Sequence, residues 1–342
     1  MDNSALKRLL TEHLRAHPAA QAQDAVKFLY QGEFGGGHLI ADPAAALARL
    51  RAELDACPAG DGPLSEPLGG GLCRLNLAAA KGKITPETLC AMFTATADGV
   101  RGGAAAFAEK LALARETGLP GMEEYLRAYA GAGFPAVSHS EAYRRAYAPA
   151  YRVVRQEYAD FFPLFAAVDR APRPLLIGID GGCASGKTTL GALLASVYDM
   201  ELYHADDYFL PFALRTEERL SEPGGNLHRE RLRAEVLEPL AAGRAPVTRA
   251  FDCGSGLLGP AVSHPLKALG AVEGSYSLHP ELRGFYGLKV FLETDGAARR
   301  ARLRARCGDE ALARFYTRWI PLEERYFAAC GVRACADLIF RT

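Results

Sequence analysis

The chain lacks a long apolar segment, a net charge and any closely spaced pair of cysteines. No apolar run approaches the about 20 residues that a membrane-spanning helix needs, and residues 1–10 carry Lys7 and Arg8 without an apolar signal core. Lys and Arg number 40 and Asp and Glu number 40, so no overall field favours nucleic acid or an anionic membrane as a partner. We therefore expect a cytoplasmic protein with neither nucleic acid nor a membrane as a partner.

The 8 cysteines are scattered and form no C-x-x-C pair. Structural zinc sites use paired ligands at short spacing, so the sequence shows no sign of such a site. A chain without a signal peptide usually keeps its thiols reduced. Cys183 lies within a glycine-rich loop and could be redox-sensitive, but a small side chain that simply fits the loop is the plainer interpretation.

The length of 342 residues fits two domains better than one. Residues 171–174 read Ala-Pro-Arg-Pro, and two prolines in four residues disfavour a helix and suit a linker. The sequence therefore predicts one domain of residues 1–170 and a second of residues 171–342.

Residues 1–170 follow a mostly helical pattern, with apolar side chains three to four positions apart. Asp42-Pro43 and Thr85-Pro86 each join a capping residue to a first-turn proline, and residues 138–141 have the spacing of a capping box. The three glycines at 69–71 are not followed by Gly-Lys, which favours a simple turn. We expect a series of tyrosines to pack between helices: Tyr143, Tyr147, Tyr151 and Tyr158.

A second active site within residues 1–170 is one interpretation of two polar segments. Residues 31–38 form a glycine-rich loop with Glu33 and His38, and His139 lies in a later polar cluster. Capping, turn geometry and helix packing explain these residues more plainly, so the role of this domain stays open.

After residue 174, short apolar runs alternate with helical periods. This alternation is typical of a parallel sheet that helices cover on both faces. The candidate strands are residues 175–180, 202–205, 269–272, 288–292 and 336–340.

Residues 181–188 read GGCASGKT and match the phosphate-loop pattern G-x-x-x-x-G-K-[ST]. An apolar strand leads into the loop and an amphipathic helix leads out. Glycines let backbone N–H groups approach phosphates without a Cβ clash, and the helix N-terminus favours an anion. Lys187 would supply charge at the β- and γ-phosphates of ATP, and the Thr188 hydroxyl could bind Mg²⁺. The predicted nucleotide-binding residues are Gly181, Gly182, Cys183, Ala184, Ser185, Gly186, Lys187, Thr188 and Thr189.

Carboxylates follow two of the candidate strands. Asp206 begins a D-D-Y-F run, and Glu273 ends the apolar run of residues 269–272. Residues that leave the carboxyl ends of parallel strands face the ligand crevice, where the phosphate loop also lies. Asp206 could accept the proton of an attacking hydroxyl, and Glu273 could hold Mg²⁺ directly or through water.

Residues 299–306 are rich in arginine, which matches the charge that spreads over oxygens during phosphoryl transfer. A mobile arginine segment could close over ATP and exclude water. Most of these arginines must face solvent, and we select Arg302 and Arg306 as the two that reach the phosphates.

With these motifs, residues 174–342 resemble the uridine kinase and phosphoribulokinase family of phosphate-loop kinases. The resemblance rests on residues 181–189, 206–209, 223–226, 272–274 and the arginine segment after Leu292. The D-D-Y-F run also looks like the D-D-F-F run of nicotinamide riboside kinases. Residues 1–170 look like the helical extension of some bacterial uridine-kinase-like proteins.

The resemblance implies an α/β fold with a five-stranded parallel core, a phosphate loop and an arginine lid. It implies that Asp206 is the catalytic base, that Glu273 belongs to the Mg²⁺ environment and that Asn226 helps to hold a ribose. His228 stands where the family's N-x-D run has an aspartate. Residues 251–254, Phe-Asp-Cys-Gly, depart from the Y-D-F run of uridine kinases.

The sequence thus predicts transfer of the γ-phosphate of ATP, with Mg²⁺, to a hydroxyl of a small molecule, specifically a nucleoside. A kinase for another small alcohol or sugar derivative and an ATP-dependent switch remain as alternatives. The predicted catalytic residues are Lys187, Asp206, Arg302 and Arg306, and the predicted acceptor-binding residues are Asp207, Tyr208, Asn226 and His228.

Overall fold

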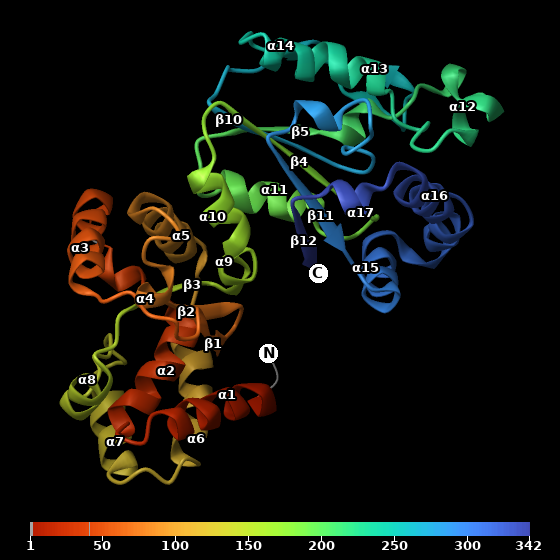
Figure 1. The fold of residues 1–342 in the computed structure, drawn as a ribbon. Helices are drawn as coiled ribbons and strands as arrows, with labels where there is room; N and C mark the ends of the chain where they lie inside the picture. The colour runs from red at the N-terminus through yellow and green to blue at the C-terminus, as the bar shows by residue number, and fades with distance from the viewer. Residues whose placement is uncertain (1–2, 41) are drawn as a thin grey trace. The chain divides into compact units, whose positions relative to one another are not determined.

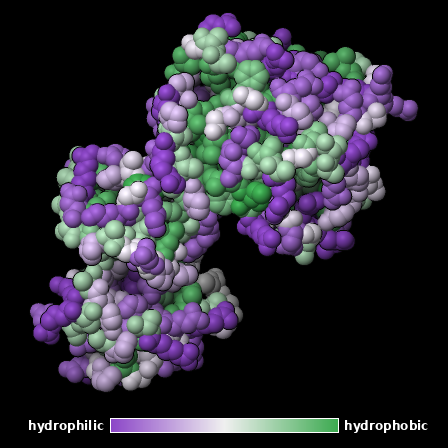
Figure 2. All heavy atoms as spheres, viewed as in Figure 1, coloured by the Kyte–Doolittle hydropathy of each residue, from purple (hydrophilic) through white to green (hydrophobic). Residues whose placement is uncertain are grey.

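The computed structural model describes residues 3–40 and 42–342, which form two compact units that divide between Asp169 and Arg170 (Figure 1). In the view of Figure 2, hydrophilic residues cover much of the surface of each unit, and hydrophobic residues appear in patches between them. Among the described helices, none combines the length and the apolar character that crossing a membrane requires.

The N-terminal unit is mostly helical, as predicted, but it also contains a small antiparallel sheet with strand order β1-β2-β3. The three glycines at 69–71 form the turn between β1 and β2, each with a positive φ, so the predicted turn is confirmed. Its helices are α1 Asn3–Ala16, α2 Ala22–Phe34, α3 Pro43–Ala56, α4 Leu77–Ala80, α5 Pro86–Gly99, α6 Ala104–Arg115, α7 Met122–Gly131, α8 Glu141–Tyr147, α9 Gln156–Asp160 and α10 Phe162–Arg170, with a short 3₁₀ turn η1 Gly37–Leu39; its strands are β1 Ser65–Gly69, β2 Leu72–Asn76 and β3 Tyr151–Arg155.

Local signals place several of these helices correctly. Asp42 caps α3 by accepting a hydrogen bond from the Ala45 N–H at 2.7 Å, and Thr85 caps α5 in the same way. The predicted capping box at residues 138–141 is wrong, because it would make Ser138 the cap. Helix α8 begins at Glu141, and its cap is Ser140. Tyr151 lies on strand β3 and not on a helix, and its ring packs against the core of the N-terminal unit.

A buried carboxylate ties helix α2 to the loop before α8. Asp24 is fully buried, and its oxygens accept hydrogen bonds from the Ser140 N–H (3.0 Å) and the Ser140 hydroxyl (2.6 Å). The Nδ1 atom of His139 lies 2.9 Å from the same carboxylate. Burial lowers the pKa of His139 to about 4, the charges of Arg74 and Lys27 add to this effect, and Asp24 opposes it.

In the C-terminal unit, five parallel strands form one sheet in the order β12-β11-β4-β10-β5. Each predicted strand is found, and the predicted fold class is confirmed. The strands are β4 Leu175–Gly181, β5 Glu201–His204, β10 Leu269–Glu273, β11 Leu288–Glu293 and β12 Leu338–Arg341. Two small antiparallel sheets pair β6 Val247–Thr248 with β9 Val262–Ser263 and β7 Phe251–Asp252 with β8 Leu257–Leu258.

Helices cover both faces of this sheet. Helix α11 contacts β4, β10 and β5, while α13 to α14 run along the other side (Figure 1). The helices are α11 Lys187–Ala195, α12 Glu217–Ser221, α13 Arg229–Leu232, the π-helical η4 Arg233–Leu237, α14 Glu238–Ala241, α15 Gly296–Arg314 with a break at Gly308, the π-helical η6 Phe315–Trp319, α16 Ile320–Cys330 and α17 Val332–Cys335, with 3₁₀ turns η2 Ala205–Tyr208, η3 Phe212–Leu214 and η5 Arg283–Phe285.

The central strand β4 is packed so closely that one position admits no side chain. A Cβ atom on Gly178 would lie 2.6 Å from the ring of Tyr286 and 2.8 Å from the side chain of Leu278. Both neighbours are buried, so neither can move away without disturbing the core. Gly178 therefore lets β4 sit at the centre of the sheet.

We expect Gly178→Ala to destabilise the C-terminal unit by about 1–3 kcal/mol, because the added methyl group overpacks the core. The chain has a single tryptophan, Trp319, in this unit, so its fluorescence during urea unfolding measures the change. Gly284→Ala is the matched control, since a Cβ there would meet no atom within 4 Å. Equal unfolding midpoints for the two variants would contradict this account.

We expect the N-terminal unit to lose stability as the pH falls from 6.5 towards 4. The unfolded chain protonates His139 near pH 6.5, while the folded chain does so only near pH 4. Between these values protons favour the unfolded chain, by up to about 3 kcal/mol. Amide hydrogen exchange in α2, corrected for the intrinsic rate, measures this loss. His139→Asn retains a donor towards Asp24 but does not titrate, so an equally steep loss in that variant would refute the explanation.

Candidate functional site

The phosphate loop connects the end of β4 to the start of α11. Gly181 and Gly186 adopt φ values of 153° and 93°, and a Cβ on Gly181 would lie 2.5 Å from the Leu292 carbonyl oxygen. Only glycine tolerates this backbone, so the loop curls tightly. The Lys187 ammonium spans the loop and donates to the carbonyl oxygens of Gly181 (2.8 Å) and Gly182 (2.9 Å). All residues predicted to bind nucleotide, 181–189, thus belong to this loop and the first turn of α11.

Thr188 and Glu273 meet at the carboxyl ends of β4 and β10. The Thr188 hydroxyl lies 3.1 and 3.2 Å from the two carboxylate oxygens of Glu273. His204, at the end of β5, holds the same carboxylate through Nδ1 at 2.6 Å. Glu273 is almost fully buried and pairs in register with Ile179 on one side and His204 on the other. The structure therefore brings the two predicted metal ligands together.

Asp206 follows directly after β5 in the turn η2. Desolvation raises the pKa of its carboxyl group, the charges of Glu273 and Glu323 raise it further, and Lys187 and Arg306 oppose the rise. The side chain is nevertheless open to solvent. Asp206, Lys187 and Glu273 thus share one electrostatic environment at a single edge of the sheet.

The two segments predicted to bind the acceptor lie side by side. The Leu210 N–H donates to the Asn226 carbonyl at 2.8 Å, and the His228 N–H donates to the Tyr208 carbonyl at 2.7 Å. Asp207 is half-buried beside His204, whose charge lowers its pKa while desolvation, the larger effect, raises it. Within the described part of the chain, the buried Oδ1 atom of Asn226 has no hydrogen-bond partner.

Two predicted acceptor-binding residues are drawn into other contacts. The ring of Tyr208 is buried in the core of the unit, and the Arg231 guanidinium lies over it at 5.0 Å. Tyr208 is therefore placed as a packing residue. His228 turns its Nδ1 atom towards Glu230 at 3.2 Å.

The arginine segment lies in helix α15, and some of its side chains contact the phosphate loop. The Arg302 guanidinium donates to the Ala184 carbonyl at 3.2 Å, and Arg306 contributes to the field at Asp206. Arg299, which the sequence gave no reason to prefer, also lies beside the loop: a Cβ on Gly182 would be 3.1 Å from its Nη2 atom. Helix α15 thus places three arginines around the loop and Asp206.

Two buried carboxylates that the sequence did not single out shape the loop. Asp180, at the end of β4, accepts hydrogen bonds from the N–H groups of Gly181 (2.7 Å) and Leu278 (2.9 Å). Glu323 of α16 accepts from the Cys183 N–H at 2.9 Å and from the Ser275 hydroxyl at 2.9 Å. A charged residue inside the apolar run of β4 was a visible signal for Asp180. Glu323 had none, because it lies 140 residues from its partner Cys183.

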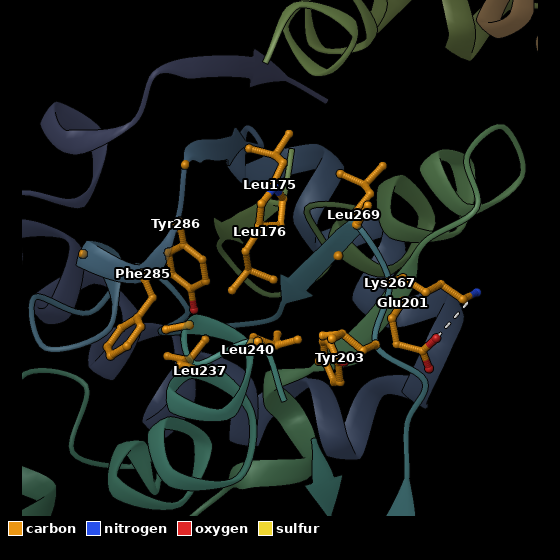
Figure 3. A pocket seen from close by; sticks show the side chains of 18 residues that line it. Leu175, Leu176, Glu201, Tyr203, Leu237, Leu240, Lys267, Leu269, Phe285 and Tyr286 are labelled. Carbon is orange, nitrogen blue, oxygen red and sulfur yellow. Dashed lines mark ion pairs between the residues drawn. The ribbon is translucent and has the colours of Figure 1, made fainter. Parts of the chain in front are cut away.

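A separate cavity of about 620 Å³ lies at the opposite edge of the sheet (Figure 3). It is lined by residues at the amino ends of the strands, including Leu175, Leu269 and Tyr286, and by Leu237 of η4 and Leu240 of α14. Lys267 and Glu201 form an ion pair at its border, with 3.7 Å between charged atoms. The lining is mostly apolar and remote from the phosphate loop, so this cavity does not belong to the site.

Comparison with known proteins finds similar folds. No family model matches the chain, and no curated protein matches it. The chain is similar, over 54% of its length and 98% of the other chain, to a protein described as a possible uridine kinase from Bacillus stearothermophilus, at 20% identity and a TM-score of 0.42. It is also similar, over 50% of its length and 91% of the other chain, to a protein provisionally described as a fructose transport system kinase from Silicibacter sp. TM1040, at 22% identity and a TM-score of 0.38. Both similarities fall in the C-terminal half of the chain.

Cys183 is a poor nucleophile in this loop. Burial raises the pKa of its thiol to about 12, and the neighbouring carboxylate of Glu323 adds to the rise. Because the thiolate is the reactive form, the plainer interpretation of Cys183 as a small fitting residue is the better one.

We expect iodoacetamide to label Cys183 roughly 10-fold or more slowly than Cys253, because so little of the buried thiol is ionised. Cys253 is exposed and serves as the internal comparison within the same chain. Peptide mass spectrometry of the intact protein, sampled over time at mildly alkaline pH, gives both rates. Labelling of Cys183 at the rate of Cys253 would contradict the raised pKa.

Proposed function

We propose that the C-terminal unit is an ATP-dependent kinase that transfers the γ-phosphate to a hydroxyl of a small molecule. The observation that carries the proposal is the gathering of Lys187, Thr188, Glu273 and Asp206 at the carboxyl ends of β4, β10 and β5. These three strands are neighbours in the sheet. The groups proposed to hold the phosphate donor, to bind the metal and to accept the proton therefore lie next to one another.

The residues present fit MgATP. The loop N–H groups and the Lys187 ammonium suit phosphate oxygens, and the oxygens of Thr188 and Glu273 are the hard ligands that Mg²⁺ prefers. When bound, MgATP supplies the transferable phosphoryl group and part of the charge neutralisation. Arg299 and Arg302 of α15 are near enough to the loop to hold the transferred group's oxygens.

Asp206 is proposed as the general base. It is open to solvent, so an acceptor hydroxyl can reach it, and its raised pKa brings it closer to the working pH than an ordinary aspartate. Its carboxylate would take the hydroxyl proton as the oxygen attacks the terminal phosphorus. An ATP-dependent switch would have no need of a base in this position.

A nucleoside is the acceptor class that we propose. The paired segments around Tyr208 and Asn226 form a wall beside Asp206, and the unpartnered Asn226 Oδ1 can accept a hydrogen bond from a sugar hydroxyl. A sugar or another small alcohol would present the same hydroxyl groups. A panel of nucleosides, sugars and small alcohols, with ADP release by the full chain as readout, separates these acceptors.

We expect Asp206→Asn to lower kcat by roughly 10²-fold or more while MgATP binding persists, because the amide accepts no proton. Steady-state turnover and an equilibrium nucleotide-binding assay measure the two effects. Asp199→Asn is the matched control, since Asp199 is exposed before β5 and pairs with Lys267 at 2.9 Å. Near-normal turnover of Asp206→Asn would remove Asp206 from the role of base.

A further inference from the structure

Helix α2 of the N-terminal unit turns a polar stripe towards the core. Asp24, Lys27 and Gln31 lie three and four residues apart, so they share one face of the helix. Asp24 is 0% exposed and Gln31 is 4% exposed. Burying polar groups costs free energy unless every one is paired, so such a stripe calls for a reason beyond packing.

Arg74 of β2 lies beneath this stripe. Its Nη1 atom donates to the Glu66 carboxylate at 2.9 Å and its Nε atom donates to Gln31 Oε1 at 2.9 Å. The guanidinium lies over the ring of Tyr151 at 4.8 Å. Arg74 is 3% exposed, and its Nη2 atom has no partner among residues 3–40 and 42–342. A buried guanidinium thus retains a free donor.

A chain of hydrogen bonds links Arg74 back to Asp24. Gln31 lies 3.2 Å from the Tyr151 hydroxyl, and that hydroxyl lies 2.6 Å from Nε2 of His139. The other ring nitrogen of His139 faces Asp24 at 2.9 Å. Asp24 thereby orients the imidazole, and Tyr151 and Arg74 complete a connected buried network.

The positive charges around this network exceed the negative ones. Lys27 donates to the Val137 carbonyl at 2.7 Å, and Arg144 donates to the His139 carbonyl at 2.7 and 3.0 Å. Within the described residues neither forms an ion pair with a carboxylate. With Arg74 they make three cations around two carboxylates, Asp24 and Glu66.

The shifted pKa values agree with an excess of positive charge. Burial lowers the pKa of Lys27 to about 8, and Arg74 and Arg144 lower it further, while Asp24 opposes them. Burial also lowers the pKa of His38, and Lys27 adds to that effect. An anion bound here would offset the repulsion between these positive charges.

We propose that Lys27 and Arg74, beside His139, form a second ligand site, which binds the carboxylate or phosphate group of a small molecule. Lys27 and Tyr151 are half-buried and Arg144 is exposed, so part of the cluster is open to solvent. The free Nη2 donor of Arg74 and the Lys27 ammonium are the groups that an oxyanion would take as partners. The site is independent of the proposed kinase function.

A metal ion is the competing occupant, and the charges disfavour it. His13, His17 and Glu66 bring three ligand atoms within 4.8 Å of one another. The Glu66 carboxylate, however, already accepts a hydrogen bond from Arg74, and Nδ1 of His13 lies 2.5 Å from it. A divalent cation at this point would face the arginine. Glu33, which the sequence placed in a glycine-rich loop, lies instead in helix α2. It pairs with Lys110, accepts a hydrogen bond from the Gly103 N–H and lies outside the cluster.

The test uses the full chain carrying Lys187→Ala, which removes the ammonium that would otherwise hold phosphate at the phosphate loop. Inorganic phosphate and acetate are titrated separately, and NMR of ¹³C-labelled histidine rings follows His139. A saturable shift with phosphate, with acetate or with both supports the site and identifies the anionic group. No saturable shift of His139 with either anion overturns the proposal.

Variants locate the binding. Lys27→Met and Arg74→Gln should each weaken the anion at least about 10-fold, as expected for loss of a charged hydrogen bond. Arg152→Gln is the matched control, because Arg152 is a buried arginine on the adjoining strand β3 that pairs with Glu53 instead. If Arg74→Gln does not fold, Lys27→Met decides the result, because Lys27 is only half-buried. Unchanged affinity in Lys27→Met, or an equal loss in Arg152→Gln, overturns the proposal.

Discussion

The buried carboxylate of Asp180 is the interaction on which the phosphate loop depends. It receives N–H groups from Gly181 and Leu278 and the Tyr326 hydroxyl at 2.8 Å, so it joins β4, the segment after β10 and helix α16. Burial raises its pKa to about 6, and these donors and the charge of Lys187 oppose the rise. A carboxylate withdrawn from water would be costly without them, so the start of the loop is held to all three elements at once.

Helix α16 extends this arrangement to the loop itself. Glu323 is one turn before Tyr326, and it holds the Cys183 N–H while Tyr326 holds Asp180. Helix α15, which precedes it, adds Arg302 at the Ala184 carbonyl. The backbone that would receive phosphates is therefore shaped by the last fifth of the chain, and the same elements bring the arginines.

The buried charged groups of the two units differ in how their hydrogen-bonding capacity is used. In the C-terminal unit the buried carboxylates of Asp180 and Glu323 are satisfied by backbone and hydroxyl donors, as expected of groups that fix a shape. In the N-terminal unit, as far as residues 3–40 and 42–169 are described, the polar network retains an unpaired guanidinium nitrogen on Arg74 and two cations, Lys27 and Arg144, that donate to carbonyl groups. The two carboxylates of the C-terminal unit thus have their donors within the protein, whereas Nη2 of Arg74 finds no partner among the described residues.

The sequence by itself determined the parallel sheet and its phosphate loop. A strand that is buried on both faces has a continuous apolar run in its sequence, and a loop that must curl around phosphate needs glycines at fixed spacing. Both patterns are local, so they can be recognised from the sequence. The position of Asp206 and Glu273 at one edge followed from the same rule, because each stands directly after an apolar run. The small sheet of the N-terminal unit escaped prediction, since β1 is five residues long and contains Pro67.

Only the tertiary structure decided which of these side chains act together. Glu323 on Cys183, Arg299 over Gly182 and Arg74 against Gln31 are contacts between residues far apart along the chain, and no periodicity records them. Tyr208 shows the reverse case: its motif suggested a ligand contact, and packing against the core turned the ring inward. Local sequence patterns specify helices and strands because they reflect backbone geometry and burial. A functional site depends on residues that are distant in sequence, and only the packed chain brings these together.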